Sequence, residues 1–208
     1  MAKRPLDQKR SAKYLGVLID DGLSWKHHID NINLKIRRGI GMLYKMRHLV
    51  TSSTIKTLYY SFIQPYLDYN LINWSSAPNS YLSCLISSSR KAVQAIGPIG
   101  DETIPYKMFD ILPFDSYITY KKGIFMWKIY NKVLPESTAL GFNKNTADIY
   151  GGENSNKYLL PHRRTKISRR QNLYSSIKLW NGIPDVIKAS PSLNIFKTKF
   201  KHHLMLSL

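Results

Sequence analysis

The chain has 208 residues, of which 31 are Lys or Arg and 13 are Asp or Glu, giving a formal net charge of +18. Its hydrophobic content of 43% is ordinary for a folded protein, and its apolar runs are too short to cross a bilayer. The single cysteine, Cys84, excludes an internal disulfide and a cysteine-rich zinc site. A reducing intracellular compartment, the nucleus or the cytoplasm, is the natural expectation.

The positive charge favours a polyanionic partner. RNA, DNA or an RNA–DNA duplex is the first candidate. An anionic membrane surface comes second, and a basic protein without a nucleic-acid role is the remaining alternative. Residues 154–208 hold eleven basic side chains and one acid, Asp185, so the last quarter of the chain carries over half of the net charge.

The first 25 residues predict a polar arm (1–12) and a strand with a turn (13–25). The run from Lys13 to Asp20 is apolar enough for one strand, and we expect it to be an unpaired edge. Asp21-Gly22 is a turn pair. Adjacent aspartates such as Asp20-Asp21 can hold Mg²⁺ in polymerases, but that chemistry requires a third carboxylate on a neighbouring strand. The turn explains Asp21 more simply.

Residues 26–100 predict a helical bundle. A helix from about Lys26 to His48 has one apolar face, and Gly39 lies near that face, where a missing side chain could let another helix approach. A second helix starts after the cap Thr51 and continues, kinked, across Pro65. Its apolar stripe comprises Ile55, Leu58, Tyr59, Phe62, Tyr66 and Tyr69. A third helix follows, as far as Gly97-Pro98.

Residues 101–208 predict a second helical region that is strongly basic. Asp115 could cap a helix ending near Val133, which is apolar on two sides and therefore buried between neighbours. Residues 141–158 are polar and rich in Gly and Asn, which indicates a long loop. Helices around 173–180 and 192–206 complete a fold that is mainly α, with one or two short N-terminal strands.

Two groups of basic residues are candidates for phosphate contact. One is a helix face comprising Lys35, Arg38 and Lys45, flanked by Arg37 and Arg47. A solvated face is its alternative interpretation. The other group, Arg163, Arg164, Lys166, Arg169 and Arg170, could be a phosphate patch, a nuclear localisation signal or a solvated run. Tyr158 and Tyr174 flank the second group and could stack on bases, although such tyrosines are more often simple core or surface aromatics.

The sequence contains no pattern typical of a catalytic or metal site. His27-His28 and His202-His203 are adjacent pairs, which do not share one helix face as an i, i+4 pair does. No nucleophile elbow and no glycine-rich phosphate loop is present. We therefore expect no catalytic residues, no metal, no cofactor and no small-molecule substrate. Nucleic acid is preferred to the membrane surface as the partner, so we also expect no membrane association.

Several motifs, in order and with matching spacing, resemble the C-terminal part of reverse transcriptases from non-LTR (LINE-type, jockey-like) retrotransposons. Asn70 replaces a usual glycine, and Gln94 or Ala95 stands where an arginine is common. The matching segments are Lys13–Asp20 with Leu23–Ile29, Leu58–Tyr69 with Trp74, Arg90–Ile96, Leu179–Pro184 and Ser192–Lys201.

The resemblance implies a role in holding nucleic acid. In that family the first segment joins the palm to the thumb, and the helical thumb clamps the RNA–DNA duplex. Tyr14, Leu15 and Gly16 would then lie near the primer, and the Lys35, Arg38 and Lys45 face would meet the duplex. Because the palm and its aromatic-x-Asp-Asp motif precede this junction in the family, we expect a fragment without polymerase activity of its own.

Three functions compete at this point. The first is a reverse-transcriptase fragment that binds nucleic acid. The second is an inactive gene fragment without a selected function. The third is a recruited interaction module that binds protein or self-associates through apolar surface.

Overall fold

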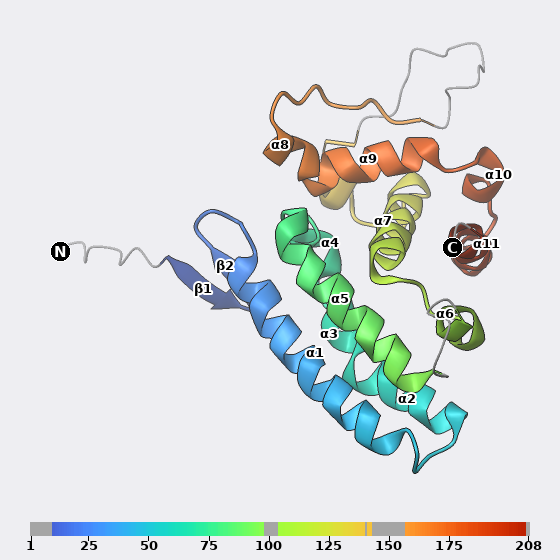
Figure 1. The fold of residues 1–208 in the computed structure, drawn as a ribbon. Coiled ribbons are helices and arrows are strands. Elements are labelled where there is room, and N and C mark those ends of the chain that lie inside the picture. The colour runs from blue at the N-terminus through green and yellow to red at the C-terminus, as the bar shows by residue number, and fades with distance from the viewer. Residues whose placement is uncertain (1–9, 98–103, 140, 143–156, 207–208) are drawn as a thin grey trace. The chain divides into compact units, whose positions relative to one another are not determined.

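The computed structural model describes residues 10–97, 104–139, 141–142 and 157–206, and confirms a mainly helical fold with two short N-terminal strands (Figure 1). The predicted arm (residues 1–9) and most of the predicted loop (residues 143–156) lie outside these residues. No helix among the described residues has the length and hydropathy that crossing a membrane requires. The chain divides into two compact units: unit 1 comprises residues 1–70 and 77–96, and unit 2 comprises 71–76 and 97–208.

Unit 1 begins with a β-hairpin where one strand was expected. β1 (Ser11–Tyr14) pairs antiparallel with β2 (Val17–Asp20), and Tyr14 lies opposite Val17. Leu15 and Gly16 form the two-residue connection, with φ angles of 45° and 82°. Positive φ at both central residues is the geometry of a type I′ turn, which matches the twist of the strands. The prediction of a single unpaired strand was therefore wrong, because the Leu15-Gly16 turn folds the segment on itself.

The Asp20–Gly22 segment links the hairpin to the first helix. Leu23 N–H donates to the Asp20 carbonyl over 2.9 Å, which confirms the predicted turn at Asp21-Gly22. The two carboxylate oxygens of Asp20 accept hydrogen bonds from the backbone N–H groups of Ser24 (2.8 Å) and Trp25 (2.9 Å). Trp25, the residue before the helix, makes no side-chain cap. Asp20 thus fixes the two residues that precede α1 to the end of the hairpin.

α1 (Lys26–Met46) is the amphipathic helix that the sequence predicts. It buries an aliphatic stripe that includes Ile29, Ile36 and Leu43. A Cβ atom at Gly39 would lie 2.6 Å from Ile63 Cδ1 and 3.3 Å from the Phe62 carbonyl oxygen. The expected close approach at Gly39 is confirmed, and the neighbour is the end of α2.

The second predicted helix is divided into three pieces, α2 (Ser52–Phe62), α3 (Gln64–Asp68) and α4 (Leu71–Trp74). Thr51 caps α2 as expected, since its Oγ1 accepts from Thr54 N–H over 3.3 Å. Asn70 has a φ of 54°, and asparagine tolerates this left-handed conformation, which ends α3. Because the helix is interrupted, the residues after Phe62 do not keep the helical phase of α2. Tyr66 and Tyr69 are therefore exposed and do not continue the predicted apolar stripe.

α5 (Asn79–Ile96) completes unit 1 by packing along α1. Ser88 donates a hydrogen bond to Asn33 Oδ1 over 2.6 Å, a polar link between the two helices. The buried residues of α5 include Leu82, Leu85 and Val93. Unit 1 is therefore a small bundle whose long helices carry the hairpin at one end of α1 (Figure 1).

Unit 2 is arranged around α7 (Phe114–Tyr130), which packs against α4, α9 (Asn172–Gly182) and α11 (Leu193–Met205). As expected, α7 is apolar on more than one side. Pro113 occupies its N-cap, so the prediction that Asp115 caps it was wrong. The remaining elements are α6 (Ile104–Phe109), a 3₁₀ helix (Glu136–Ala139), α8 (Lys166–Arg170) and α10 (Asp185–Lys188).

The core of unit 2 is aromatic. Trp180 and Phe196 are fully buried, with ring centroids 6.2 Å apart, and Phe196 stacks on Phe200 at 5.4 Å. Gly123 of α7 lies directly against the Phe200 ring, where a larger residue would overlap it. Ser192 caps α11, since its Oγ accepts a 3.3 Å hydrogen bond from Ile195 N–H.

Candidate nucleic-acid interface

Unit 1 contains a groove of about 350 Å³ between the hairpin tip, α1 and α3. The hairpin tip is held there because Tyr69 donates its phenolic hydrogen to the Leu15 carbonyl oxygen. Two residues predicted from the resemblance, Leu15 and Gly16, thus lie in one wall. The lining residues are Leu15, Gly16, His28, Asn31, Ile32, Lys35, Pro65, Tyr66 and Tyr69.

Lys35 is the charged residue that joins this groove to the basic face of α1. Its Nζ atom lies 5.2 Å from the centre of the Tyr66 ring, a cation–π arrangement that holds the ammonium group beside the groove. The structure therefore brings together Gly16 and Lys35, which are separated in sequence and were predicted independently. An aromatic ring, a positive charge and exposed backbone in one groove suit a polynucleotide strand.

His28 lines the groove and connects the hairpin to α1. It is buried, and its Nδ1 accepts a hydrogen bond from Leu18 N–H over 3.3 Å. Burial, and secondarily the positive charge of Lys35, lower the pKa of His28 below its ordinary value of 6.5. His28 is consequently neutral at pH 7, and its place in the groove is structural. His27 is exposed, so the two adjacent histidines lie on different faces of α1, as predicted.

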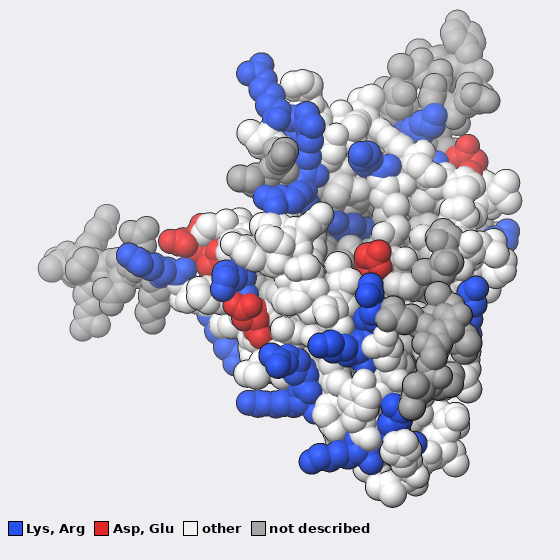
Figure 2. All heavy atoms as spheres, viewed as in Figure 1, with Lys and Arg blue, Asp and Glu red and all other residues white. Residues whose placement is uncertain are grey.

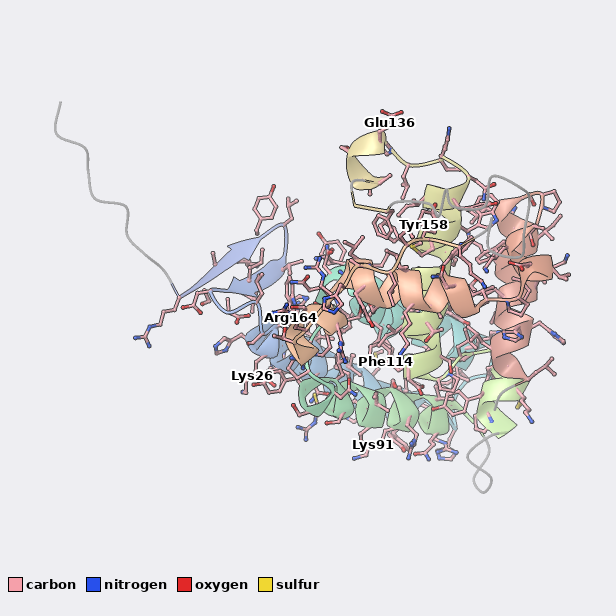
Figure 3. The ribbon with its side chains drawn as sticks, turned by 90° about the horizontal axis from the view of Figure 1, so that it is seen from above. Lys26, Lys91, Phe114, Glu136, Tyr158 and Arg164 are labelled. Atoms are coloured by element: carbon pink, nitrogen blue, oxygen red, sulfur yellow. The ribbon has the colours of Figure 1, made fainter. Side chains whose placement is uncertain are left out.

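The other members of the predicted basic face, Arg38 and Lys45, are exposed on α1 and do not line the groove. Arg37 is also exposed, whereas Arg47 is half-buried and lies over Tyr44, with 5.9 Å between its guanidinium carbon and the ring centre. α5 adds Lys91, which points away from the unit (Figure 3). Lys and Arg side chains gather along α1 and α5 on the face drawn in Figure 2.

Tyr14 is 66% exposed at the end of β1, outside the groove wall that Gly16 forms. Sequence reasoning missed Asn31, Pro65, Tyr66 and Tyr69 as groove residues. It places Tyr66 and Tyr69 in an apolar stripe, because the period of that stripe continues across Pro65. The available signal was Asn70, a residue that favours the left-handed conformation ending a helix.

The second predicted group of basic residues surrounds α8 in unit 2. Thr165 caps this short helix, accepting from Ser168 N–H over 3.2 Å, and Arg169 Nε donates to the Arg163 carbonyl over 3.0 Å. Arg164 and Arg169 are exposed, while Arg163 and Arg170 are half-buried. Figure 3 marks Arg164 just before α8, and positive side chains gather over this segment in Figure 2. Lys166 begins the helix.

Of the two flanking tyrosines, Tyr158 cannot stack on bases as it lies. It is 4% exposed, and its backbone exchanges hydrogen bonds with the Asn181 side chain, both 2.9 Å long (Figure 3). Burial raises the pKa of its hydroxyl to about 12. Tyr158 is therefore a core residue, which corrects the stacking hypothesis, whereas Tyr174 is half-buried.

No set of three or more His, Cys, Asp or Glu side chains within the described ranges is placed to hold a metal ion. Asp20, the residue that most resembled a polymerase ligand, directs both oxygens to backbone N–H groups. The basic and aromatic side chains of this groove, Lys35 and Tyr66, are groups that can attract an anion and stack on a flat ring.

The fold and these surfaces define a mainly helical, basic protein with an aromatic-lined groove. No protein-family model matches the chain, and no solved structure matches it. It is similar to a curated Drosophila melanogaster protein, the "Probable RNA-directed DNA polymerase from transposon X-element", with 27% identity over 95 residues. That segment covers 44% of this chain and 10% of the polymerase, so the chain matches a small part of that protein's length.

Proposed function

We propose that this chain is the thumb and C-terminal region of a non-LTR retrotransposon RNA-directed DNA polymerase, and that it binds an RNA–DNA duplex. The observation that carries the proposal is the groove in which the hairpin tip, Lys35 and Tyr66 meet. Arg38 and Lys45 extend the positive surface along the same helix. The similarity to the X-element polymerase supports the same origin. DNA or RNA alone would meet the same phosphate-binding surface.

The proposed division of labour assigns residues 13–25 to the end of the palm, 26–100 to the thumb and 101–208 to a basic C-terminal region. Tyr14 and Gly16 face the primer end of the duplex, and Lys35, Arg38 and Lys45 contact its backbone. Arg163, Arg164, Lys166, Arg169 and Arg170 contact a further stretch of template or target strand. The nucleus and the cytoplasm both offer such partners.

Fluorescence anisotropy with a labelled blunt RNA–DNA duplex, measured over a range of salt concentrations, tests this proposal. The logarithm of the association constant should fall linearly with the logarithm of salt concentration, because phosphate contacts release counterions. Replacing Lys35, Arg38 and Lys45 together with Gln should reduce the slope by up to about 3, at about 0.9 for each phosphate that is no longer neutralised.

The matched control replaces three other positive residues, Lys132, Lys197 and Lys199, with Gln, which removes the same total charge. If both triple variants weaken binding equally, the α1 face has no special role and the proposal fails. A flat salt response of the unmodified protein would also contradict it.

We also propose that these 208 residues do not extend a primer by themselves. They contain no aromatic-x-Asp-Asp motif, and Asp20 is engaged in closing a turn. Primer extension on a poly(rA)–oligo(dT) template with Mg²⁺ or Mn²⁺ should yield no product. Product formation that survives purification to homogeneity would overturn this part of the proposal.

A second candidate function is protein interaction or self-association, which the hairpin region favours. Tyr14, Leu15 and Leu23 are 66%, 72% and 60% exposed, an unusual set of large apolar side chains on so short a segment. Light scattering across a concentration series distinguishes this function. A concentration-dependent dimer that Leu15→Asn abolishes would support it, and a monomer throughout would exclude self-association.

A further inference from the structure

Unit 2 contains a larger pocket, about 600 Å³ in volume, whose lining includes Arg169 of the second basic group and Tyr174, which flanks it. It lies among α7, α8, α9 and α11. A volume between about 300 and 1,000 Å³ is typical of sites for small ligands or single building blocks of a polymer. The lining residues are Thr119, Arg169, Tyr174, Ser175, Lys178, Leu179, Gly182, Ile183, Phe200, His203 and Leu204.

The polar part of the lining is suited to an anion. Arg169, Lys178 and His203 supply basic groups, and Thr119, Tyr174 and Ser175 supply hydroxyls. No Asp or Glu belongs to this lining, which consists of described residues throughout. The hydrogen bond from Arg169 Nε to the Arg163 carbonyl, 3.0 Å long, restrains the guanidinium group of this lining residue. Guanidinium and ammonium groups together favour phosphate oxygens.

A buried cation behind the pocket wall gives independent support for an anion. Lys122 of α7 is 8% exposed, and its Nζ donates to Ser175 Oγ over 3.0 Å. A hydroxyl is a neutral partner, so the charge of this buried ammonium is not balanced by that bond. Burial lowers the pKa of Lys122 to about 8, which leaves it mostly protonated at pH 7. An anion bound beside Ser175 would provide the missing negative charge.

The remaining wall of the pocket is apolar. Leu179, Ile183, Phe200 and Leu204 supply aliphatic and aromatic surface to the lining, and Tyr174 adds a second aromatic ring. An inorganic anion would leave this apolar surface uncovered. A ligand that combines phosphate with a flat, weakly polar body fits both parts, and a nucleotide has that composition.

We propose that this pocket binds one unpaired nucleotide of a nucleic-acid strand, with the phosphate on Arg169, Lys178 and His203 and the base on Tyr174 and the apolar wall. The inference rests on the proposed function only in taking a polynucleotide as the ligand. It concerns a different unit and a different form of nucleic acid, a single strand instead of the duplex assigned to α1.

The test compares the full chain's binding to a blunt RNA–DNA duplex and to the same duplex with a short single-stranded DNA overhang. The unmodified protein should bind the overhang form more tightly. Lys178→Ala should abolish that preference. It should also reduce the salt dependence of binding to the overhang duplex, the slope of log association constant against log salt concentration, by about 0.7, the value for one phosphate contact on a single strand. Lys199→Ala, an exposed lysine on α11 outside the pocket, is the matched control and should keep the preference.

A second variant separates stacking from charge. Tyr174→Ala should reduce the overhang preference about fivefold or more without changing the salt slope, because stacking releases no counterions. Tyr174→Phe should restore the preference. Circular dichroism of each variant establishes that the fold is kept. If Lys178→Ala and Tyr174→Ala fold normally and both keep the preference, the pocket is not the site and the proposal is wrong.

Competition distinguishes a nucleotide from a simple anion. Adenosine monophosphate should abolish the tighter binding of the overhang duplex at concentrations at which inorganic phosphate does not. Equal competition by both would show a general anion site and overturn the nucleotide assignment. Failure of this proposal leaves blunt-duplex binding unchanged, whereas failure of the proposed function appears as loss of dependence on Lys35, Arg38 and Lys45.

Discussion

Each unit packs other elements against one long helix, α1 in unit 1 and α7 in unit 2. The two helices differ in the side chains that they bury and in where their charged residues lie. In unit 1, α1 buries one aliphatic stripe that includes Ile32, Ile36 and Leu43, and its opposite side remains for Lys and Arg. In unit 2, α7 is contacted by three other helices, and aromatic rings such as Trp180 fill the space. A helix with neighbours on several sides has little free surface, so one of its own lysines, Lys122, is buried.

This difference bears on where each of the proposed partners would bind. A one-sided helix offers an open, extended surface, which suits the backbone of a duplex. A surrounded helix offers a pocket at the junction of its neighbours, which suits a single group. The following variants test how far this comparison holds, from the largest expected effect to the smallest.

The aromatic core of unit 2 should be the most sensitive part of the chain. Trp180→Ala should lower the free energy of unfolding by about 3–5 kcal/mol, since the side chain is fully buried and a cavity would remain. Urea unfolding followed by tryptophan fluorescence measures this, and three of the four tryptophans belong to unit 2. Leu43→Ala in unit 1 is the counterpart, at about 2–5 kcal/mol. A decrease below about 1 kcal/mol for Trp180→Ala would contradict the packing described.

The buried lysine should make unit 2 sensitive to alkaline pH. The folded-state pKa of Lys122, about 8, lies below its ordinary value of 10.5, so the unfolded chain binds more protons between these values. Stability should therefore rise with pH across this interval. Lys122→Met should be more stable than the unmodified protein at pH 7 by up to about 3 kcal/mol, and the difference should shrink towards pH 10.5.

Urea titrations at pH 7 and pH 10 measure the effect. Lys132→Met, an exposed lysine beyond α7, is the control and should show no such pH-dependent difference. If the free energy of unfolding of Lys122→Met differed from that of the unmodified protein by the same amount at both pH values, Lys122 would not be a buried cation.

Close helix contacts at two glycines allow a direct comparison of the units. Gly123→Ala should destabilise by about 1–3 kcal/mol, because the new methyl group would overlap the Phe200 ring inside a packed core. Gly39→Ala should cost less, since the nearest atom, Ile63 Cδ1, ends a flexible side chain. Gly41→Ala has nothing within 4 Å and should stabilise α1 by up to about 1 kcal/mol. Thermal unfolding ranks the three, and an equal cost at all three positions would refute the contacts.

The smallest effect is expected at the junction of the hairpin and α1. Burial alone would raise the pKa of Asp20, but hydrogen bonds from Ser24 and Trp25 outweigh it and lower the pKa below 3.8. This stabilisation is present above pH 3.8 and is lost as the pH falls through the lower folded-state value. Asp20→Asn should cost about 1 kcal/mol at neutral pH, because only one atom of the amide can accept and one of the two hydrogen bonds is lost. The cost should disappear in acid, and a cost independent of pH would contradict it.

The sequence predicted the elements of unit 1 well where one interaction dominates. The stripe of α1, the cap Thr51 and the close approach at Gly39 each depend on local spacing or on a single residue type. The hairpin was missed because Leu15 adopts a positive φ, which leucine rarely does. Tyr66 and Tyr69 were misplaced because a periodic pattern does not reveal that the helix is divided after Phe62 and again after Asp68.

The sequence by itself determined the mainly helical class, the excess of positive charge and which lysines and arginines lie on one side of α1. These properties follow from composition and from the 3.6-residue period. Tertiary structure alone decided that Gly16 and Lys35 share a groove, that Tyr158 belongs to the core and that Lys122 lies behind a basic pocket. Each depends on contacts between residues far apart in the chain, and such contacts are fixed by packing and hydrogen bonding, not by local spacing.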